Sequence, residues 1–515
     1  MDVEERFDLR DVLADGAAAT TSRWVKVVDQ SRCIGCHACT TACKSENDVP
    51  LGVNRTYVKA VEVGTFPQVR RAFQVTRCNQ CADAPCVAAC PTAAMYRRED
   101  GIVDFDKSAC IGCKACMAAC PYDAIFINPA DHSAEKCNLC SHRIDVGLEP
   151  ACVVVCPVEA ILVGDLDDPN SKVSKIVHRE PVTVRRPEKE TRPKLYYKGA
   201  HQATLDPLAA RRPDGDLYMW SEQGAVPHAV ASGHPGHGNS SAAALLAYDV
   251  PHRAPWDWRV SLYTWTKSIA AGAYLVALAL GLAGRVSWSS TLWLWIAPLV
   301  AGGALAATGA VLIWDLEHPR RFFYIFTRPQ WRSWLVRGAF VIGAYSAVLG
   351  LHVAASLASL RTPQPWLGVA GGPLAAAAAA YTGYLFAQAK ARDLWQSPLL
   401  PPHLIVQSAL VGAAALMPFG QAGHALAWVV AGSAASHLLF AAAEATLTHP
   451  TAHAHLAVWE MTRGSYAPLY WTGVGCVAVA AAAPWIGVFA VPFALVGLLA
   501  HEHAFVQAGQ RVPLA

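Results

Sequence analysis

The chain has 515 residues, enough for two or three domains, and only 16% of them are charged. The mean hydropathy of +0.25 is high for a soluble protein. The net charge of +3 is too small to indicate a nucleic-acid-binding protein. Sixteen of the seventeen cysteines lie between residues 33 and 156, whereas long apolar stretches begin only near residue 260. The sequence therefore predicts a soluble cysteine-rich module followed by a membrane module.

The first thirty residues contain no apolar core of the length that a signal peptide needs, and they contain no twin-arginine pair. We therefore expect no export signal. Residues 24–28 (WVKVV) predict a short strand that leads into the first cysteine loop. The cysteines then follow in four groups of four: Cys33, Cys36, Cys39 and Cys43; Cys78, Cys81, Cys86 and Cys90; Cys110, Cys113, Cys116 and Cys120; and Cys137, Cys140, Cys152 and Cys156.

Sixteen thiolates in four sets of four match the ligand count of four [4Fe–4S] clusters. Three closely spaced cysteines wrap three corners of one cluster, and the fourth cysteine, three residues further on, reaches the other cluster of a pair. Structural zinc tolerates C-x2-C pairs, but the C-x2-C-x2-C-x3-C-P run is a poor zinc pattern. A disulfide framework needs an oxidising compartment and is typical of short secreted chains. The spacing therefore favours iron–sulfur clusters.

The second, third and fourth groups each end in a C-P-x-x-A unit followed by an apolar residue, which indicates an internal repeat. Strand-like pieces at residues 58–63 and 73–75 separate the first two groups. We therefore predict that residues 1–200 form an α+β, doubled ferredoxin-like electron-transfer domain with hairpin insertions.

Residues 22–200 resemble the four-cluster electron-transfer subunits of the molybdopterin oxidoreductase superfamily, such as those of dimethyl sulfoxide and polysulfide reductases. The matching stretches are residues 137–140 (CNLC), 164–171 (GDLDDPNS) and 192–197 (RPKLYY). Spacing alone allows other pairings, but the resemblance implies these four ligand sets: Cys33, Cys36, Cys39 and Cys156; Cys137, Cys140, Cys152 and Cys43; Cys78, Cys81, Cys86 and Cys120; and Cys110, Cys113, Cys116 and Cys90.

Residues 201–255 are rich in Gly, Pro and Ala and carry scattered histidines at positions 228, 234 and 237. A histidine-rich tract can bind metal, but these residues have neither cysteine nor regular spacing, so a flexible linker is favoured. From residue 256 the chain predicts an all-α bundle with eight transmembrane helices. We expect the helices at 260–284, 291–314, 335–360, 366–389, 402–420, 423–447, 468–488 and 489–508.

Residues 256–515 resemble the polysulfide-reductase (NrfD-type) membrane anchors. The stretches that carry this resemblance are residues 265–272 (WTKSIAAG), 315–322 (DLEHPRRF) and 381–385 (YTGYL). The resemblance implies eight helices, no haem, and electron exchange with a quinone, either menaquinone or ubiquinone.

Quinone chemistry needs groups that move protons at the end of the bundle facing the clusters. Tyr263 and Lys267 in the first helix, and Asp315, His318 and Arg321 after the second helix, are the candidates. Asp315 and His318 share a helical face and could relay protons. The alternative is that Asp315, His318 and Arg321 form a structural cap. His437 and Glu444 are ionisable residues inside a predicted span, which suggests a proton path; packing and interface roles are the alternatives.

Both ends of an eight-helix bundle lie on the same membrane face, together with the cluster domain. That face carries an excess of positive charge, which predicts that the cluster domain lies in the cytoplasm, at the inner membrane. Nine basic residues, Arg320, Arg321, Arg328, Arg332, Arg337, Lys390, Arg392, Arg463 and Arg511, oppose only Arg285 and Arg361.

No dinucleotide-binding fingerprint is present in the sequence. We therefore predict an electron-transfer and anchor subunit of a quinone-linked oxidoreductase, whose substrate chemistry takes place on a molybdenum- or tungsten-bis-pterin partner. A higher oligomer of the complex is compatible with this prediction. The resemblance implies that the partner docks on the side of the second and third cysteine groups and that the side of the first and fourth groups approaches the membrane.

Sulfite or formate oxidation is the favoured reaction of the partner, because both substrates are made inside cells. The alternative is the quinol-oxidising core of an assembly like alternative complex III, with multihaem cytochrome partners.

Overall fold

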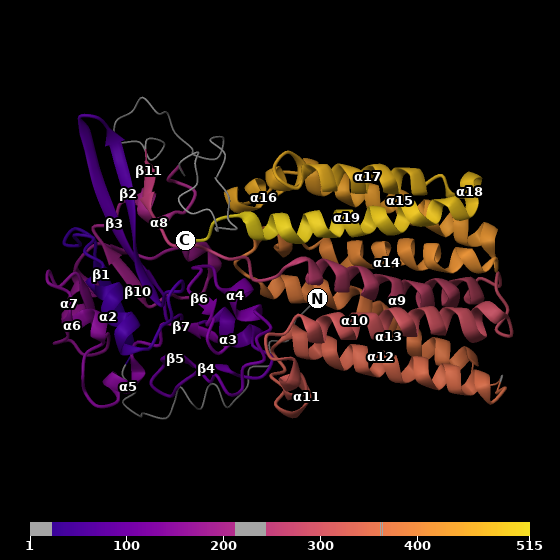
Figure 1. Cartoon of the computed structure of the whole chain (residues 1–515), viewed down its shortest axis with the longest axis horizontal. Helices are drawn as coiled ribbons and strands as arrows, with labels where there is room; N and C mark the ends of the chain where they lie inside the picture. Colours follow the sequence, from indigo (N-terminus) through magenta and orange to yellow (C-terminus); the bar gives the residue numbers. More distant parts are fainter. Residues whose placement is uncertain (1–22, 212–243, 361, 363) are drawn as a thin grey trace.

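The computed structural model describes residues 23–211, 244–360, 362 and 364–515. Figure 1 shows a cysteine-rich region of short strands and helices at one end and a bundle of long helices at the other. The predicted order of an α+β region followed by a helical region is confirmed. The histidines at 228, 234 and 237, and with them the central part of the predicted linker, lie outside the described residues.

A four-stranded sheet joins the two ends of the cysteine-rich region. Its strand order is β8 (Ile161–Asp165), β1 (Trp24–Asp29), β10 (Leu195–Lys198) and β9 (Val182–Thr183). β1 pairs in parallel with β10 and antiparallel with β8. Val25, Val27 and Val28 of β1 are buried. The predicted strand at 24–28 is therefore confirmed, and it becomes central because the chain returns to it on both sides.

A long hairpin stands out from this region, with strands β2 (Thr56–Thr65) and β3 (Gln68–Arg77) of ten residues each. The predicted strand pieces at 58–63 and 73–75 lie in it. β11 (Leu245–Tyr248) pairs with β2 as a third strand, and α8 (Gln202–Leu205) packs beside it. These described parts of the predicted linker 201–255 are therefore packed, because Leu246 and Ala203 bury their apolar side chains against the hairpin.

Short helices and two small hairpins carry the cysteine loops. The helices are α2 (Ala38–Glu46), α3 (Pro85–Ala89), α4 (Ala115–Ala119), α5 (Ser141–Ile144), α6 (Ala151–Val154) and α7 (Lys172–Arg179). The hairpins are β4 (Met95–Arg97) with β5 (Val103–Phe105), and β6 (Ile125–Ile127) with β7 (Ala134–Lys136). Each hairpin begins shortly after a Cys-Pro pair, so the repeated unit in the sequence corresponds to a repeated structural element.

Among the described residues, six helical stretches are long and apolar enough to cross a membrane. They are Trp258–Leu282 (α9), Leu292–Trp314 (a π-helical turn, Leu292–Ile296, and α10, Ala297–Trp314), Trp334–Leu357 (α12), Leu400–Phe419 (α14, Leu400–Leu416, and a 3-10 turn), Gly423–Thr446 (α15) and Ala483–Arg511 (α18, Ala483–Ile486, and α19, Ala490–Arg511).

The remaining helices of this half are α11 (Tyr324–Thr327), α13 (Gln364–Gln388), α16 (Ala452–Thr462) and α17 (Ala467–Ala480). α13 and α17 occupy the fourth and seventh predicted spans without being among the six apolar stretches. The boundary predicted near residue 488 differs from the structure. α17 already ends at Ala480, and after α18 and a short 3-10 turn, α19 runs from Ala490 to Arg511.

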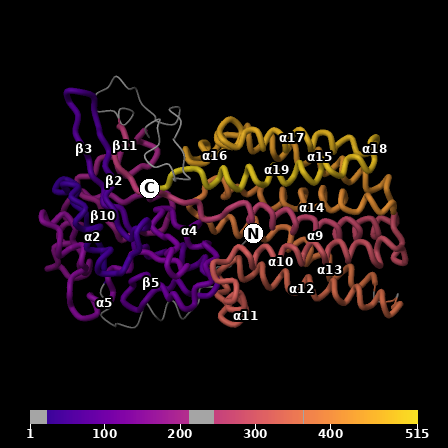
Figure 2. Tube along the Cα trace, viewed as in Figure 1, coloured from indigo at the N-terminus to yellow at the C-terminus, as the bar shows by residue number. Residues whose placement is uncertain are grey.

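α9 lies in the interior of the bundle, against α10, α13, α14 and α19 (Figure 2). Small residues allow this close packing. A Cβ atom on Gly272 would lie 1.7 Å from the carbonyl oxygen of Ser408 in α14. The outward-facing side chains in the middle of other helices are large and apolar: Leu351, Leu439 and Val496 are 54–73% exposed. Such a surface suits lipid rather than water.

Candidate functional site

The cysteines converge in four places. One small cavity is lined by Cys33, Cys36, Cys39 and Cys156 (set 1). Cys43 lies near Cys137, Cys140 and Cys152 (set 2), and Asn47 Nδ2 is 3.8 Å from Cys43 Sγ and 3.6 Å from Cys140 Sγ. Further cavities are lined by Cys78, Cys81, Cys86 and Cys120 (set 3), and by Cys90, Cys110, Cys113 and Cys116 (set 4). The structure thus brings together the same sets as those the family resemblance implied. Ligation of a cluster by each set stays a prediction.

The chemistry of these sets fits iron–sulfur clusters. All seventeen cysteines of the described chain are unpaired, and most are buried. Burial raises the pKa of Cys43 and of Cys86 to about 12, so thiolates at these positions need a positive partner such as cluster iron. Backbone N–H groups already point at sulfur, with Met95 N donating to Cys90 Sγ at 3.4 Å and Ala160 N to Cys156 Sγ at 3.2 Å.

Shared helices order the four sets into a row. α2 carries Cys39 of set 1 and Cys43 of set 2. α3 carries Cys86 of set 3 and is followed directly by Cys90 of set 4. Sets 2 and 3 adjoin because Gln80, beside Cys78, donates to the carbonyl oxygen of Cys137 at 2.8 Å. The order along the row is therefore 1, 2, 3, 4.

Two buried cations contact the sulfurs of set 2. Lys26 Nζ lies 3.1 Å from Cys137 Sγ, and an Arg77 guanidinium nitrogen lies 3.0 Å from Cys152 Sγ. Both cations are 1% exposed. Burial alone would raise the pKa of Cys137, but the charges of Lys26 and Arg77 outweigh it and lower this pKa to about 6. Set 2 thus has two buried positive charges within hydrogen-bonding distance of its sulfurs.

Set 4 meets the helical bundle. Trp256 Nε1 donates to the carbonyl oxygen of Cys113 at 3.1 Å, and His318 N donates to that of Ile111 at 3.2 Å. A Cβ on Gly112, whose φ is +70°, would lie 2.4 Å from Glu317 Cβ. Set 4 is built from cysteines of the second and third groups in the sequence. The prediction that the side of the first and fourth cysteine groups approaches the membrane is therefore wrong. The loop after α10 fits closely onto the glycine of the third group instead.

Asp315, His318 and Arg321 lie together at this junction. Asp315 Oδ1 is 3.4 Å from Arg259 Nε and 3.5 Å from Lys114 Nζ, and burial raises the pKa of Asp315 against the effect of these cations. Arg321 donates to the carbonyl oxygens of Lys107 and Cys110, both at 2.9 Å. His318 Nε2 lies 3.3 Å from Ser133 Oγ. His318 and Arg321 thus make the contacts expected of a structural cap.

Tyr263 and Lys267 lie in the interior of the bundle on α9, and both are buried. Lys267 Nζ donates to the carbonyl oxygen of Ala379 at 2.7 Å and to Thr382 Oγ1 at 2.9 Å. The five predicted quinone residues therefore fall into two groups. Asp315, His318 and Arg321 lie at the junction with set 4, whereas Tyr263 and Lys267 lie inside the bundle, where Lys267 bonds to α13.

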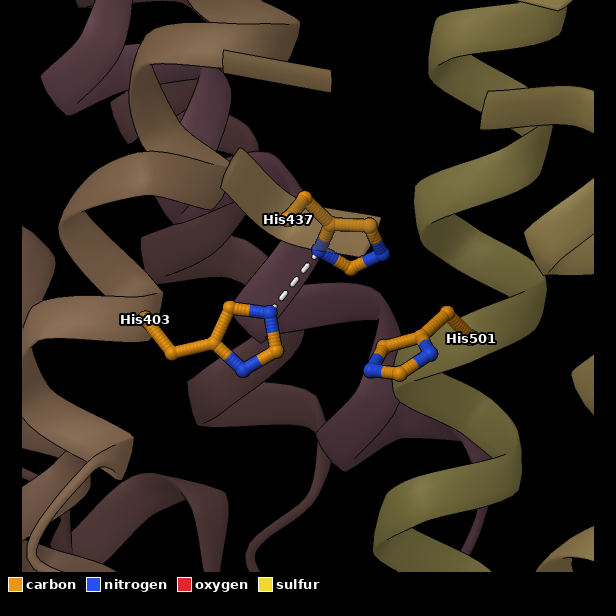
Figure 3. A group of neighbouring side chains, drawn as sticks. All are labelled: His403, His437 and His501. Carbon is orange, nitrogen blue, oxygen red and sulfur yellow. Dashed lines mark hydrogen bonds between the residues drawn. The ribbon is translucent and has the colours of Figure 1, made fainter. Parts of the chain in front are cut away.

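His437 and Glu444 lie two turns apart on α15. His437 Nδ1 is 2.9 Å from Nε2 of His403, and His501 lies beside both (Figure 3). Glu502 follows His501 and bonds to Thr264 of α9. The sequence reasoning missed His403, His501 and Glu502, although ionisable residues inside apolar helices were a usable signal.

A cavity of about 1140 Å³ opens between the cysteine-rich region and the bundle. Its lining includes Lys114, Trp256, Arg259, Glu317 and His503. Lys114 follows Cys113, and Trp256 bonds to that cysteine's carbonyl, so the cavity adjoins set 4. It also adjoins the first turn of α9 and the last turns of α19, where a membrane surface would lie.

Comparison with known families agrees with this architecture. Residues 249–513, just over half of the chain, match the family described as "Polysulphide reductase, NrfD". The chain belongs to the NrfD family. Ahead of the NrfD bundle, residues 24–45 match a 4Fe-4S binding domain and residues 69–166 a 4Fe-4S dicluster domain. The cysteine-rich domain is therefore an iron–sulfur domain that carries [4Fe–4S] clusters.

Relatives of the iron–sulfur domain include proteins that are named as reductase subunits. A tetrathionate reductase subunit of Salmonella typhimurium is 40% identical over 204 residues, which cover 39% of this chain and 80% of that protein. An iron-sulfur subunit of Halobacterium salinarum named for dimethyl sulfoxide reductase is 39% identical over 221 residues, which cover 37% of this chain and 84% of that protein. Protein NrfC of Escherichia coli K12 is 44% identical over 177 residues, covering 34% and 79%.

This chain thus joins two parts, an iron–sulfur electron-transfer subunit and an NrfD-type anchor of a reductase complex. It is a multi-pass membrane protein.

Proposed function

We propose that this chain relays electrons through four [4Fe–4S] clusters, held by sets 1 to 4, between a catalytic partner and membrane quinone. The observation that carries this proposal is the continuous row of cysteine sets. It begins at set 1, where Cys36 is exposed, and ends at set 4, where Trp256 at the entry to the bundle bonds to Cys113. A row with one end open and one end at the membrane suits electron flow between a protein surface and the bilayer.

The partner that we propose is a molybdenum- or tungsten-bis-pterin subunit docked over set 1. Ile34, Val154 and Val155 are 39–59% exposed around this set, and an apolar surface of this kind suits a protein interface. Relatives are named for tetrathionate and dimethyl sulfoxide reductases. Of the two substrates favoured by the sequence, sulfite and formate, we rank sulfite first because it shares sulfur chemistry with the substrates in these names.

The quinone, menaquinone or ubiquinone, would enter the cavity beside set 4. Lys114 and Arg259 line this cavity and also contact Asp315, so a proton on Asp315 has a short route to a quinone oxygen. Tyr263 and Lys267 would supply polar groups deeper along α9. We assign His318 and Arg321 a supporting role as loop anchors rather than contact with quinone.

We propose three domain segments: 1–200 for the clusters, 201–255 as the connection, and 256–515 for the anchor, which would cross the membrane eight times. Trp256, at the start of the bundle, donates its backbone N–H to Gln510 Oε1, near the end of the bundle, at 2.9 Å. The two ends therefore lie on the same side, which supports an even number of crossings. α13 and α17 would be the two crossings beyond the six apolar stretches. The excess of positive charge on this side supports a cytoplasmic iron–sulfur domain.

Purification of the native complex from membranes tests this proposal. We expect about sixteen irons per chain, molybdenum or tungsten from a partner, and sulfite-dependent reduction of quinone. If haem co-purifies without a pterin metal, the proposal fails, and a quinol-oxidising core like that of alternative complex III takes its place. Asp315→Asn should slow quinone reduction and leave reduction of a soluble dye intact, whereas the exposed control Asp168→Asn should change neither.

A further inference from the structure

Three histidines from three different helices meet inside the bundle (Figure 3). His403 lies on α14, His437 on α15 and His501 on α19, and they are 8%, 0% and 3% exposed. One ring nitrogen from each lies within 4.8 Å of the others. The closest pair is His403 Nε2 and His437 Nδ1 at 2.9 Å. We call His403, His437 and His501 the histidine cluster.

Aromatic neighbours fix the orientation of these rings. His403 stacks on Phe440 with ring centroids 4.9 Å apart and an interplanar angle of 16°. His501 lies 4.6 Å from His437 and 5.7 Å from Tyr470, measured between ring centroids. The three nitrogen groups therefore converge as a result of packing rather than of adjacency in the chain.

The histidine cluster has hydrogen-bonding capacity that the described residues leave unused. His437 Nε2 and His501 Nδ1 are buried without a hydrogen-bond partner. Lipid offers no hydrogen bonds to replace those of water, so unused polar atoms at this depth are costly. His437 Nε2 and His501 Nδ1 therefore have the capacity to bind a ligand from outside the chain, whereas His403 Nε2 and His437 Nδ1 are hydrogen-bonded to each other.

A small cavity adjoins the histidine cluster. Its volume of about 20 Å³ is room for roughly one water-sized particle, and its lining includes His403, Gln407, His501 and Glu502. Gln407 Oε1 and Glu502 Oε1 are also buried without a hydrogen-bond partner. The site thus combines imidazole nitrogens, a nearby carboxylate and space for a single ion.

We propose that the histidine cluster binds one divalent transition-metal ion of the zinc class. Imidazole is a preferred ligand of such ions, whereas Mg²⁺ and Ca²⁺ require oxygen ligands. Zn–N bonds of about 2.0–2.1 Å in a tetrahedron place ligand nitrogens ~3.4 Å apart. The observed separations, 2.9 Å for the hydrogen-bonded pair His403 and His437 and at most 4.8 Å for the set, bracket that value, and the metal would replace the hydrogen bond of that pair. Glu502 would balance part of the ion's charge.

A metal at this site has a consequence for proton transfer. It occupies the lone pair that a relay through His437 would need, so metal binding and the predicted proton path through His437 exclude each other. The ion would also cross-link α14, α15 and α19 and so stabilise the packing of these three helices.

Metal analysis of the purified complex tests the proposal. We expect about one zinc-class ion per chain beyond the cluster iron, and its X-ray absorption should report nitrogen ligands at about 2.0–2.1 Å. Iron in the site would instead appear as an excess of iron over acid-labile sulfide, because a [4Fe–4S] cluster contains the two in equal number. His403→Gln, His437→Gln and His501→Gln should each lose the ion and keep the cluster iron.

His352→Gln is the matched control. His352 is also fully buried in the bundle, but its Nδ1 lies 3.1 Å from the Tyr274 hydroxyl and it is not part of the histidine cluster. It should keep the extra ion. If the variants fail to assemble, the wild-type complex can be treated with chelator and then titrated with Co²⁺, whose visible absorption reports a nitrogen-rich site. A wild-type complex that contains no extra ion and takes up neither Zn²⁺ nor Co²⁺ would overturn the proposal and leave a buried water in the cavity.

Discussion

The two ends of the row of cysteine sets are built differently. At set 1, Cys36 and its neighbour Ile34 are exposed. At set 4, Gly112 lies against Glu317, and Trp256 closes over the carbonyl of Cys113. The open end suits a protein that docks and exchanges electrons, and the closed end suits a permanent junction with the membrane anchor. The following predictions test the two ends and then the row between them.

Loss of a set 4 ligand should have the largest effect. Cys113→Ser should remove about four irons and abolish quinone reduction, while set 1 still passes electrons from the partner to a soluble dye. Cys36→Ser at the open end should abolish both activities. Iron analysis and parallel quinone- and dye-linked assays check this. The matched control, Cys476→Ser, should change neither activity, because this cysteine lies in α17, far from the sets in sequence. Quinone reduction by Cys113→Ser would contradict the order of the row.

The junction at Gly112 should be the next most sensitive position. Gly112→Ala combines left-handed strain of about 1 kcal/mol with a steric clash against Glu317 that costs about 1–3 kcal/mol. Gly52→Ala is the control, because Gly52 has a similar φ of +84° but nothing within 4 Å of the added Cβ. Thermal unfolding in detergent should show a larger loss of stability for Gly112→Ala. Equal losses would mean that the junction tolerates displacement.

His252 should make the closed end sensitive to alkaline pH. Burial alone lowers its pKa, but Asp249 and Asp123 outweigh burial and raise the pKa to about 9. The stabilisation is therefore complete below the unfolded pKa of about 6.5 and is lost as the pH rises through about 9. Its size is up to about 3 kcal/mol.

Unfolding temperatures measured from pH 6 to 10 should fall in the wild type and fall less in His252→Gln. The control is His142→Gln, which removes a half-exposed ion pair with Glu46 that is worth about 0–1 kcal/mol. Identical pH profiles for the wild type and His252→Gln would contradict the assignment.

The smallest expected effect lies within the row, at set 2. Lys26→Met removes a buried cation that contacts Cys137 Sγ, so the reduced cluster loses about 1.5–3 kcal/mol of stabilisation. This equals a shift of its midpoint potential by about 65–130 mV to more negative values for one electron. Potentiometric titration followed by electron paramagnetic resonance measures the shift. The exposed Lys175→Met should leave all the potentials unchanged, and so should Lys26→Met if Lys26 has only a structural role.

The cysteine spacing and the strand at residues 24–28 were predictable because both are local properties of the chain. The apolar runs in the second half were predictable in position for the same reason. Which end of the row of cysteine sets faces the bundle was not predictable from the sequence. It depends on how the loop from Asp315 to Arg321 fits against Gly112, which is distant in the chain. Nothing in the local sequence around Gly112 or Glu317 reports that contact.

The sequence by itself determined the cofactor class, the order of the two domains and the set of cysteines, since ligand type and spacing limit cluster chemistry directly. Tertiary structure decided which set meets the helical bundle and which polar groups meet inside that bundle. His403, His437 and His501 are each ordinary residues of a single apolar helix, and only the packing of α14, α15 and α19 brings their nitrogens together. Helix packing follows side-chain shape along whole surfaces, and a local motif does not encode it.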